Sequence, residues 1–321
     1  MRARLPVAAL LSAIAIALQG VMAMAPLQNI YVLSQDDGIL SVIDTTSDEI
    51  AAKIAIPGKP AAFTIDAKSR KAFATLPDDG EIAVVDLDRR AVLSTLKVGG
   101  QPFGISSDTA GRLFVGDWSA NRISVIDEKT GATEATLIVG RAPAHLVATR
   151  DGSRLFVADR ESNNVAVIDT KKLKILAEIP VGRAPFALAL SPGGKYLAVA
   201  NVQTANLSIV DTTSLRIVST PATGAMPYGV AVTHDNSEIL VSNQHGGTVS
   251  ILDARTYAPH AQIKVGRYPE GVAVLNDGRK AYVANWFSNT VSVLDLAGNV
   301  EIKKIKCPSG PRMVLAGPVE H

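Results

Sequence analysis

Three arginines stand two positions before a proline in the 321-residue sequence, each inside the same Gly-Arg-x-Pro pattern. They are Arg141, Arg183 and Arg267. A guanidinium group can hold a carboxylate or a phosphate with two parallel hydrogen bonds, which the point charge of lysine does not match. The recurrence therefore predicts an anion-binding surface, if the fold brings the three together. The alternative is that they are solvated loop residues whose aliphatic stems cover a neighbouring element.

Aromatic and charged residues accompany the same kind of proline elsewhere in the chain. Tyr228, Glu270 and Arg312 each follow a proline directly, and His145 follows another at two positions. Both tryptophans and Arg160 lie in turn-rich segments between two β-like stretches. Arginine and aromatic side chains together are typical of binding hot spots. We therefore predict a ligand-binding surface that consists of Arg141, Arg183, Arg267, Arg312, Trp118, Trp286, Arg160, Tyr228, Glu270 and His145.

Motifs for phosphate binding, nucleophilic catalysis and zinc are absent. The sequence has no glycine-rich phosphate loop and no Gly-x-Ser-x-Gly elbow. Its five histidines show no His-x-x-x-His or Cys-His spacing, so a zinc site made by the protein is not expected. The acids Asp36, Asp37, Asp78 and Asp79 fit calcium ligands or β-turns equally well. We assign no catalytic and no metal-ligating residue and expect a binding module rather than an enzyme.

The spacing of the candidate residues follows a repeat that runs through most of the chain. Seven prolines and seven aspartates recur at intervals of 42 or 41 residues. A fixed period of this size indicates a solenoid, a propeller or another repeat array. Two residue types keep one register, at Pro60, Pro102, Pro143, Pro185, Pro227, Pro269 and Pro311, and at Asp44, Asp86, Asp127, Asp169, Asp211, Asp253 and Asp295.

Each repeat contains four short β-strands and no helical periodicity. The stretch "GVAVLNDGRKAYVANWFSNTVSVLD" has apolar runs on both sides of an Asn-Asp-Gly hairpin signal. Its final aspartate can cap the following turn with its carboxylate. A fourth strand then leads into the next Gly-x-x-Pro. Four strands in about 40 residues are typical of a β-propeller blade.

The two ends of the repeat array complement each other. The segment 29–54 has the second, third and fourth strands of a repeat, whereas 307–317 has only the first. We therefore predict an all-β fold, a seven-bladed β-propeller with four-stranded blades. Its ring is closed by a composite blade from the N- and C-terminal segments. Closure removes the exposed sheet edges that would otherwise invite aggregation.

Strand alternation assigns the candidate residues to one face. The loop that enters the first strand of a blade and the loop between its second and third strands share a face, which we call the top face. All ten candidate residues fall there. The acidic pairs of the first two repeats fall on the same face, so we expect a negative sector opposite a positive one.

The motif "YVAN…NTVSVLD" resembles the YVTN-repeat β-propeller family, the YncE-like proteins of bacterial envelopes. The resemblance extends over residues 24–321 and implies a single seven-bladed propeller domain outside the cytoplasm. It implies no shared catalytic motif. The fold hosts ligand binders, scaffolds and enzymes alike, so fold alone does not fix function.

Similarity to other propellers adds two alternatives. Some sugar-lactone hydrolases resemble this fold, which implies a hydrolase of the lactonase type with Glu270, His145, Arg312 or Arg183 at the channel mouth. Haem-binding propellers resemble it too and use a channel-side histidine, so His145 is a candidate axial ligand in a redox accessory protein. We predict no cofactor, and haem or a metal ion stays open as the alternative.

The first 23 residues have the features of a cleaved signal peptide. A basic start is followed by a short apolar run and by small residues at 21–23. Loss of Arg2 and Arg4 with this segment leaves 30 basic residues against 30 acidic ones. We expect a periplasmic or secreted monomer without a membrane span, whose partner is a small molecule or an envelope protein. Single-stranded nucleic acid is a less favoured partner, because the mature charge is balanced.

Overall fold

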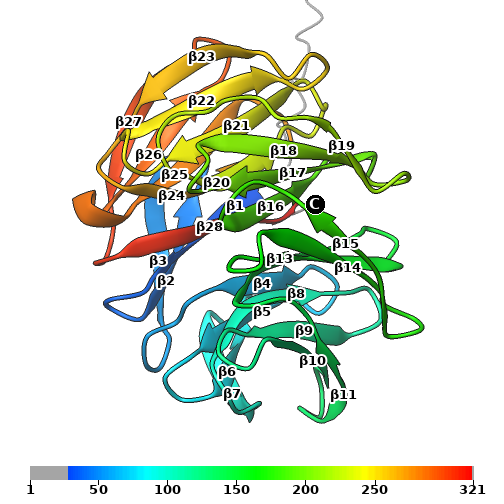
Figure 1. Ribbon diagram of the computed structural model, residues 1–321. Coiled ribbons are helices and arrows are strands. Elements are labelled where there is room, and N and C mark those ends of the chain that lie inside the picture. The colour runs from blue at the N-terminus through cyan, green and yellow to red at the C-terminus, as the bar shows by residue number, and fades with distance from the viewer. Residues whose placement is uncertain (1–27, 320–321) are drawn as a thin grey trace, which may run out of the picture.

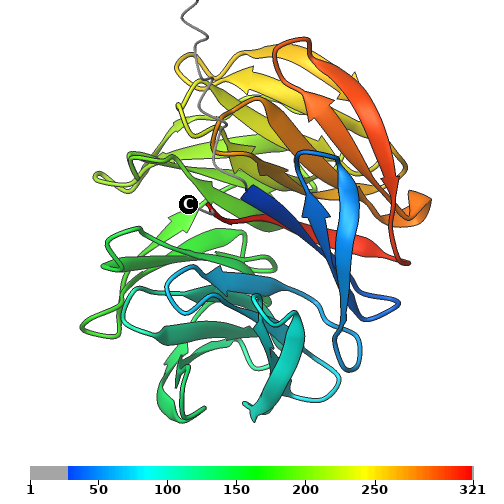
Figure 2. The same cartoon turned by 180° about the vertical axis from the view of Figure 1, so that it is seen from behind.

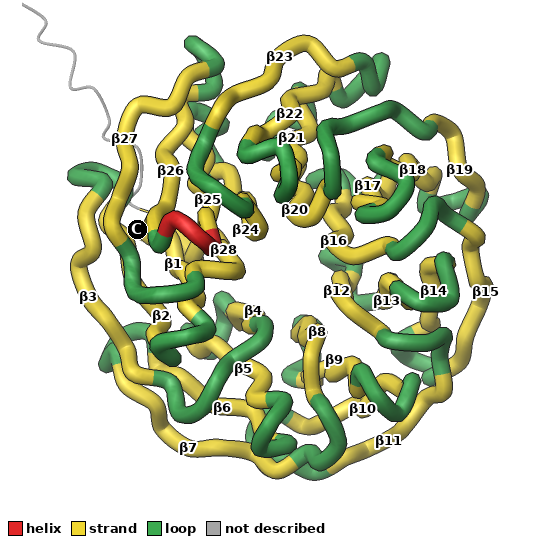
Figure 3. The backbone as a smooth tube through the Cα atoms, turned by 60° about the vertical axis from the view of Figure 1, so that its left-hand side comes forward, coloured by secondary structure: helices red, strands yellow, loops and turns green. Residues whose placement is uncertain are grey.

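Each sequence repeat folds into one four-stranded antiparallel sheet, and seven such blades form a ring (Figures 1 and 2). The computed structural model describes residues 28–319. Figure 3 shows the ring viewed approximately along its central axis, with one strand of each blade nearest the centre. The fold class and the number of blades predicted from the sequence are confirmed.

The strands are numbered in chain order, and the blades are numbered from the N-terminus. Blade 1 contains β28 (Pro311–Val319), β1 (Gln28–Ser34), β2 (Ile39–Asp44) and β3 (Glu49–Ala55). Blade 2 contains β4 (Phe63–Asp66), β5 (Lys71–Leu76), β6 (Glu81–Asp86) and β7 (Ala91–Lys97). Blade 3 contains β8 (Pro102–Ser107), β9 (Arg112–Asp117), β10 (Arg122–Asp127) and β11 (Thr133–Ile138).

The other four blades follow the same order from the centre of the ring outward. Blade 4 contains β12 (Pro143–Ala148), β13 (Arg154–Asp159), β14 (Asn164–Asp169) and β15 (Lys174–Pro180). Blade 5 contains β16 (Pro185–Leu190), β17 (Tyr196–Asn201), β18 (Asn206–Asp211) and β19 (Arg216–Ser219). Blade 6 contains β20 (Pro227–Val232), β21 (Glu238–Asn243), β22 (Thr248–Asp253) and β23 (Pro259–Lys264). Blade 7 contains β24 (Pro269–Val274), β25 (Lys280–Asn285), η1 (Trp286–Ser288), β26 (Thr290–Asp295) and β27 (Val300–Lys306).

The ring closes in blade 1, where the C-terminal strand β28 pairs with β1. The pairing is antiparallel, with Tyr31 opposite Leu315, so the composite blade predicted from the sequence is confirmed. A polar contact adds to the closure between blades 1 and 7. Asp48 accepts hydrogen bonds from Tyr282 Oη at 2.5 Å and from Lys280 Nζ at 2.6 Å. The first and last blades are thus joined by side chains as well as by the sheet.

The repeated aspartates cap the turns between the third and fourth strands. Asp253 Oδ1 accepts the backbone N–H groups of Arg255 at 2.9 Å and Thr256 at 2.8 Å. Asp44, Asp86, Asp127, Asp169 and Asp211 accept equivalent backbone bonds. A short carboxylate that bonds its own backbone is the usual reason for aspartate in such a turn. The predicted capping role is therefore confirmed.

The hydrophobic core lies between neighbouring blades, because each sheet has two faces and both are covered. Val283 of β25 is fully buried in a cluster that also contains Leu240 of β21 and Ile251 of β22. Full burial of such a side chain contributes about 1.5–3 kcal/mol. Many such contacts around the ring provide the rigid support for the top-face loops.

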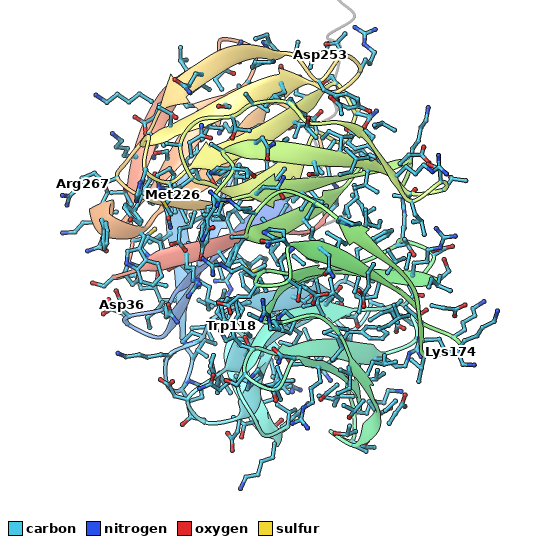
Figure 4. All side chains as sticks on the ribbon, viewed as in Figure 1. Asp36, Trp118, Lys174, Met226, Asp253 and Arg267 are labelled. Atoms are coloured by element: carbon cyan, nitrogen blue, oxygen red, sulfur yellow. The ribbon has the colours of Figure 1, made fainter. Side chains whose placement is uncertain are left out.

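Asp36 and Arg267, both in loops that strand alternation assigns to the top face, project on the same side in Figure 4, and Lys174 projects on the opposite side. Within residues 28–319 no helix has the length and apolar character to cross a membrane. The predicted signal peptide, residues 1–23, lies outside the described residues.

Candidate functional site

Two sets of equivalent side chains surround the top end of the central channel. The first set contains the residue directly after each repeated proline, and all seven members line one cavity: Ala61, Phe103, Ala144, Phe186, Tyr228, Glu270 and Arg312. The second set contains the first residue after the second strand of each blade: Gln35, Pro77, Trp118, Arg160, Val202, Gln244 and Trp286. Because the blades repeat, equivalent positions of the seven blades lie around the central axis of the ring.

A repeated backbone bond holds the two sets beside each other. Trp286 N donates to the carbonyl of Tyr268 at 2.9 Å, and Gln244 N donates to that of Met226 at 2.8 Å. The bond recurs in six blades, always to the residue before the proline, whereas Pro77 of blade 2 has no N–H to donate. At Tyr268 and Met226 this acceptor residue has a positive φ, 57° and 56°. A non-glycine residue in this region costs on the order of 1 kcal/mol. The rigid blade supports this conformation, which fixes both loops at the channel mouth.

Arg312 is the centre of the polar network at the mouth. Its Nη1 donates to Gln35 Oε1 at 2.8 Å, and its Nη2 donates to Tyr228 Oη at 3.1 Å. The guanidinium carbon also lies 5.1 Å from the ring centroid of Phe103 and 5.6 Å from that of Trp286. The side chain is 15% exposed. Four blades therefore contribute groups to one partly buried cation.

Glu270 is the anionic member of this network. Its Oε1 accepts a hydrogen bond from Gln244 Nε2 at 2.7 Å, and its Oε2 lies 3.5 Å from Arg312 Nε. The residue is 6% exposed, and Oε2 accepts no hydrogen bond. Burial raises the pKa of Glu270 to about 7, although Arg312 and Gln244 oppose the shift. The carboxyl group therefore titrates near neutral pH.

Aromatic rings form the rest of the mouth. Phe103 lies between Trp118, with ring centroids 4.7 Å apart, and Phe186, with centroids 6.1 Å apart. Phe186 in turn lies 4.0 Å from the ring of Tyr228. Burial raises the pKa of Tyr228 to about 12, so its hydroxyl keeps its proton at neutral pH.

Beneath the network lies a cavity of about 360 Å³ in the central channel. The polar network and the aromatic rings line it on one side. The rest of its wall is aliphatic and comes from the inner strands, with Val147, Leu188, Val232, Val274 and Leu315 among its residues. A concave apolar site with a few convergent polar groups is typical of small-molecule binding.

His145 lines the same cavity but is already engaged by the neighbouring blade. Its Nδ1 accepts the backbone N–H of Leu188 at 3.2 Å. Burial lowers the pKa of His145 to about 4, so the ring is neutral. A neutral imidazole that accepts at Nδ1 carries its proton on Nε2. This tautomer has no free lone pair on Nε2, so His145 does not fit the role of axial haem ligand.

The sequence matches the family model of the YNCE-like beta-propeller over residues 40–238. The chain belongs to the YNCE-like β-propeller family. The resemblance drawn from the "YVAN" motif is thereby confirmed, and the seven four-stranded blades of the structure agree with the family's description as a β-propeller. A comparison with curated proteins finds no match.

Solved structures similar to this YNCE-like propeller share its fold at low sequence identity. One is a functionally unknown protein from Desulfotomaculum acetoxidans DSM 771, with a TM-score of 0.79 and 12% identity, matched over 91% of this chain and 99% of that one. Another is a chain of Kuenenia stuttgartiensis hydrazine synthase, with a TM-score of 0.72 and 20% identity, matched over 80% of this chain and 89% of that one. At these identities the similarity concerns the fold alone.

The structure brings seven of the ten predicted site residues to the channel of this YNCE-like propeller. Arg312, Glu270, Tyr228 and His145 line the cavity. Trp286 faces Arg312, Trp118 packs on Phe103, and the charge of Arg160 acts on Tyr228.

The other three, Arg141, Arg183 and Arg267, lie exposed on the outer part of the top face. The side chain of Arg141 donates to the carbonyl of Glu161, and that of Arg267 donates to the carbonyl of Phe287. These bonds tie the loops of one blade together. A role for the three arginines in binding stays a prediction.

The predicted set omits four residues that complete the site: Phe103, Phe186, Gln35 and Gln244. Each occupies a repeated position that also contains predicted residues, so the 42-residue register itself was the signal. Within the described chain, no group of three or more acidic, histidine or cysteine side chains could hold a metal ion. Of the acidic residues considered for calcium, Asp37 instead accepts the backbone N–H of Ser309.

Proposed function

We propose that this protein is an exported binding protein that takes up a small, largely apolar molecule in the central channel. The N-terminal pattern of residues 1–23 supports export. The cavity of about 360 Å³ supports a small ligand, since it is lined mostly by aliphatic and aromatic side chains. The polar network of Arg312, Glu270 and Tyr228 would fix the orientation of the ligand.

The observation that carries the proposal is the buried carboxylate Oε2 of Glu270, which accepts no hydrogen bond and whose ion-pair partner, Arg312 Nε, lies 3.5 Å away, although the residue lines an apolar cavity. A buried carboxylate oxygen that accepts no hydrogen bond costs about 1–3 kcal/mol. The raised pKa of Glu270 indicates that Arg312 and Gln244 offset this cost only in part. A ligand that bonds this atom would offset the cost, as expected of a binding site.

The test is to fill the channel. Val232 lines the cavity on β20, whereas Val218 on the outer strand β19 is 56% exposed. Toluene and acetophenone, as simple apolar probes, should bind the wild type saturably in ligand-observed NMR. Val232→Trp should abolish this binding, and the same substitution at Val218 should not. Absence of saturable binding by both probes, or equal binding to the Val232→Trp protein, would refute the proposal.

A hydrolase is the second candidate, and Glu270 is the observation that favours it. A general base works best when its pKa is near the working pH, and burial raises that of Glu270 to about 7. The wild type should then hydrolyse an aromatic lactone such as dihydrocoumarin. Glu270→Gln would lower this turnover by about 100-fold or more. Turnover that is absent, or unchanged by the substitution, would refute the hydrolase function, and binding would remain the proposed function.

A further inference from the structure

Two polar atoms at the channel mouth each have an unused hydrogen-bonding capacity. Glu270 Oε2 receives no hydrogen bond, lies 3.5 Å from Arg312 Nε, and belongs to a residue that is 6% exposed. Tyr228 Oη accepts from Arg312 Nη2, and among the described residues no acceptor takes its own hydroxyl proton. Both residues line the cavity. The protein therefore has one acceptor and one donor that contact the same guanidinium group.

We propose that the ligand carries a carboxamide-type group on an apolar body, with its N–H bonded to Glu270 Oε2 and its C=O bonded to the Tyr228 hydroxyl. This inference rests on the proposed function, because it needs the channel to be the binding site. A group that donates and accepts at neighbouring atoms satisfies both open valences. The apolar body then lies against the aliphatic wall, which includes Val232 and Leu315.

A carboxylate fits this site less well than a neutral amide. The donors of Arg312 are already directed at Gln35, Tyr228 and Glu270. A ligand carboxylate would bring a second negative charge beside the ionised Glu270, and like charges at short range are costly in a buried site. It would also lack the hydrogen that Oε2 needs.

An amine or ammonium group also fits less well. It could donate to Glu270 Oε2, but it would leave the Tyr228 hydroxyl without an acceptor. An ammonium group would in addition lie close to the partly buried cation Arg312, and repulsion between the two would oppose binding. An alcohol can satisfy both valences only with one oxygen, whereas the two atoms of an amide can each take one.

The experiment compares three probes of nearly equal shape. Benzamide has the donor and the acceptor, acetophenone has a methyl group in place of the donor, and benzoate is an anion. Affinities are measured by ligand-observed NMR at pH 8.5, where Glu270, with a pKa of about 7, is ionised beside Arg312 and the neutral Tyr228. Benzamide should bind about tenfold more tightly than either of the others, since each lacks a hydrogen bond to a charged group.

Two substitutions should change these preferences in different ways. In Glu270→Gln, the bond from Gln244 should keep the amide oxygen at Oε1 and direct the new NH₂ into the cavity. The preference should therefore reverse, so that acetophenone binds more tightly than benzamide. In Tyr228→Phe, both probes should weaken equally, since both need the same donor. Glu134→Gln, at an exposed side chain on the outer strand β11, is the matched control and should change nothing.

The outcomes separate the inference from the proposed function. Equal binding of benzamide and acetophenone, or tighter binding of benzoate, would overturn the inference while the channel remained a binding site. If Val232→Trp blocks the binding of none of the three probes, both the proposed function and the inference are wrong. An unchanged preference for benzamide in Glu270→Gln would also overturn the inference. If the Glu270→Gln protein does not fold, the Tyr228→Phe protein tests the hydroxyl donor independently.

Discussion

Asp159 and Asn285 occupy the same position at the end of the second strand of their blades, but only the asparagine makes hydrogen bonds of good geometry. Asn285 Oδ1 accepts from the backbone of Gly266 at 3.1 Å, and Nδ2 donates to Ser292 Oγ at 2.9 Å. Asp159 is fully buried and neither carboxylate oxygen makes such a bond, although the backbone N–H of Gly140 lies close enough to lower its pKa slightly. The serine position of blade 4 is occupied by Ala166. The position that holds the amide of Asn285 in blade 7 therefore holds the carboxylic acid of Asp159 in blade 4.

Asp159→Asn should stabilise the protein at neutral and alkaline pH. Burial raises the pKa of Asp159 from 3.8 to about 7, so ionisation is unfavourable in the folded state. The cost is absent below about pH 4, grows as the pH rises to 7 and is complete above it. Urea unfolding should show a gain of about 1–4 kcal/mol at pH 8 and a smaller one at pH 5. The new amide can also donate to Asn164 Oδ1, which is buried and has no partner.

The control is the same substitution at the equivalent position of blade 3. Asp117 pairs with Arg122 at 3.1 Å and accepts the backbone N–H groups of Ser119 and Ala120. Asp117→Asn should therefore destabilise the protein at pH 8. If both substitutions change stability in the same direction, or if the effect of Asp159→Asn does not depend on pH, the burial argument is wrong.

Asp48→Asn should weaken the closure of the ring. The carboxylate accepts from Lys280 and from the buried Tyr282, and asparagine keeps the tolerance for the positive φ of 54° at this residue. A partly buried lysine without its counter-ion should cost about 1–3 kcal/mol in thermal or urea unfolding. Asp88→Asn, which breaks an exposed pair with Arg70, should cost less than about 1 kcal/mol. Equal losses would mean that the Asp48 contact adds nothing special to closure.

Gly271→Ala should disturb the channel through the backbone rather than through chemistry. A Cβ atom at Gly271 would lie 2.7 Å from the backbone nitrogen of Val314 and 2.8 Å from the carbonyl oxygen of Arg312. The strand that carries Arg312 would have to shift, at a cost of about 1–3 kcal/mol. Gly193→Ala is the matched control, since a Cβ there meets no atom within 4 Å. Circular dichroism melting measures both, and a Gly271→Ala protein as stable as the control would contradict the prediction.

Arg183→Ala distinguishes ligand binding in the channel from ligand binding by the exposed arginines of the top face. The Arg183 side chain is exposed, and within residues 28–319 it has no hydrogen-bond or ion-pair partner. Stability should therefore be unchanged within about 0.5 kcal/mol. Benzamide affinity should also stay the same, because the arginine does not line the cavity. A loss of affinity in titrations would instead favour the arginine surface predicted from the sequence.

Local features of the sequence were sufficient for the fold. The 42-residue register of proline and aspartate determined the number of blades, and the incomplete terminal repeats determined how the ring closes. Strand alternation assigned every candidate residue to one face. These inferences succeeded because each blade is a short, locally connected unit that must stack on copies of itself to bury both faces of its sheet.

Only the tertiary structure decided which of the equivalent residues meet. Arg312 bonds Gln35 and Tyr228, which are 277 and 84 residues away in the sequence. The period places all three near the axis, but side-chain length and the closed ring select the pairs. The same holds for Arg267, which bonds a carbonyl of its own blade, and for Asp159, whose buried carboxylate makes no hydrogen bond of good geometry. The repeat thus determines where side chains point, and packing across the channel determines their contacts and charge.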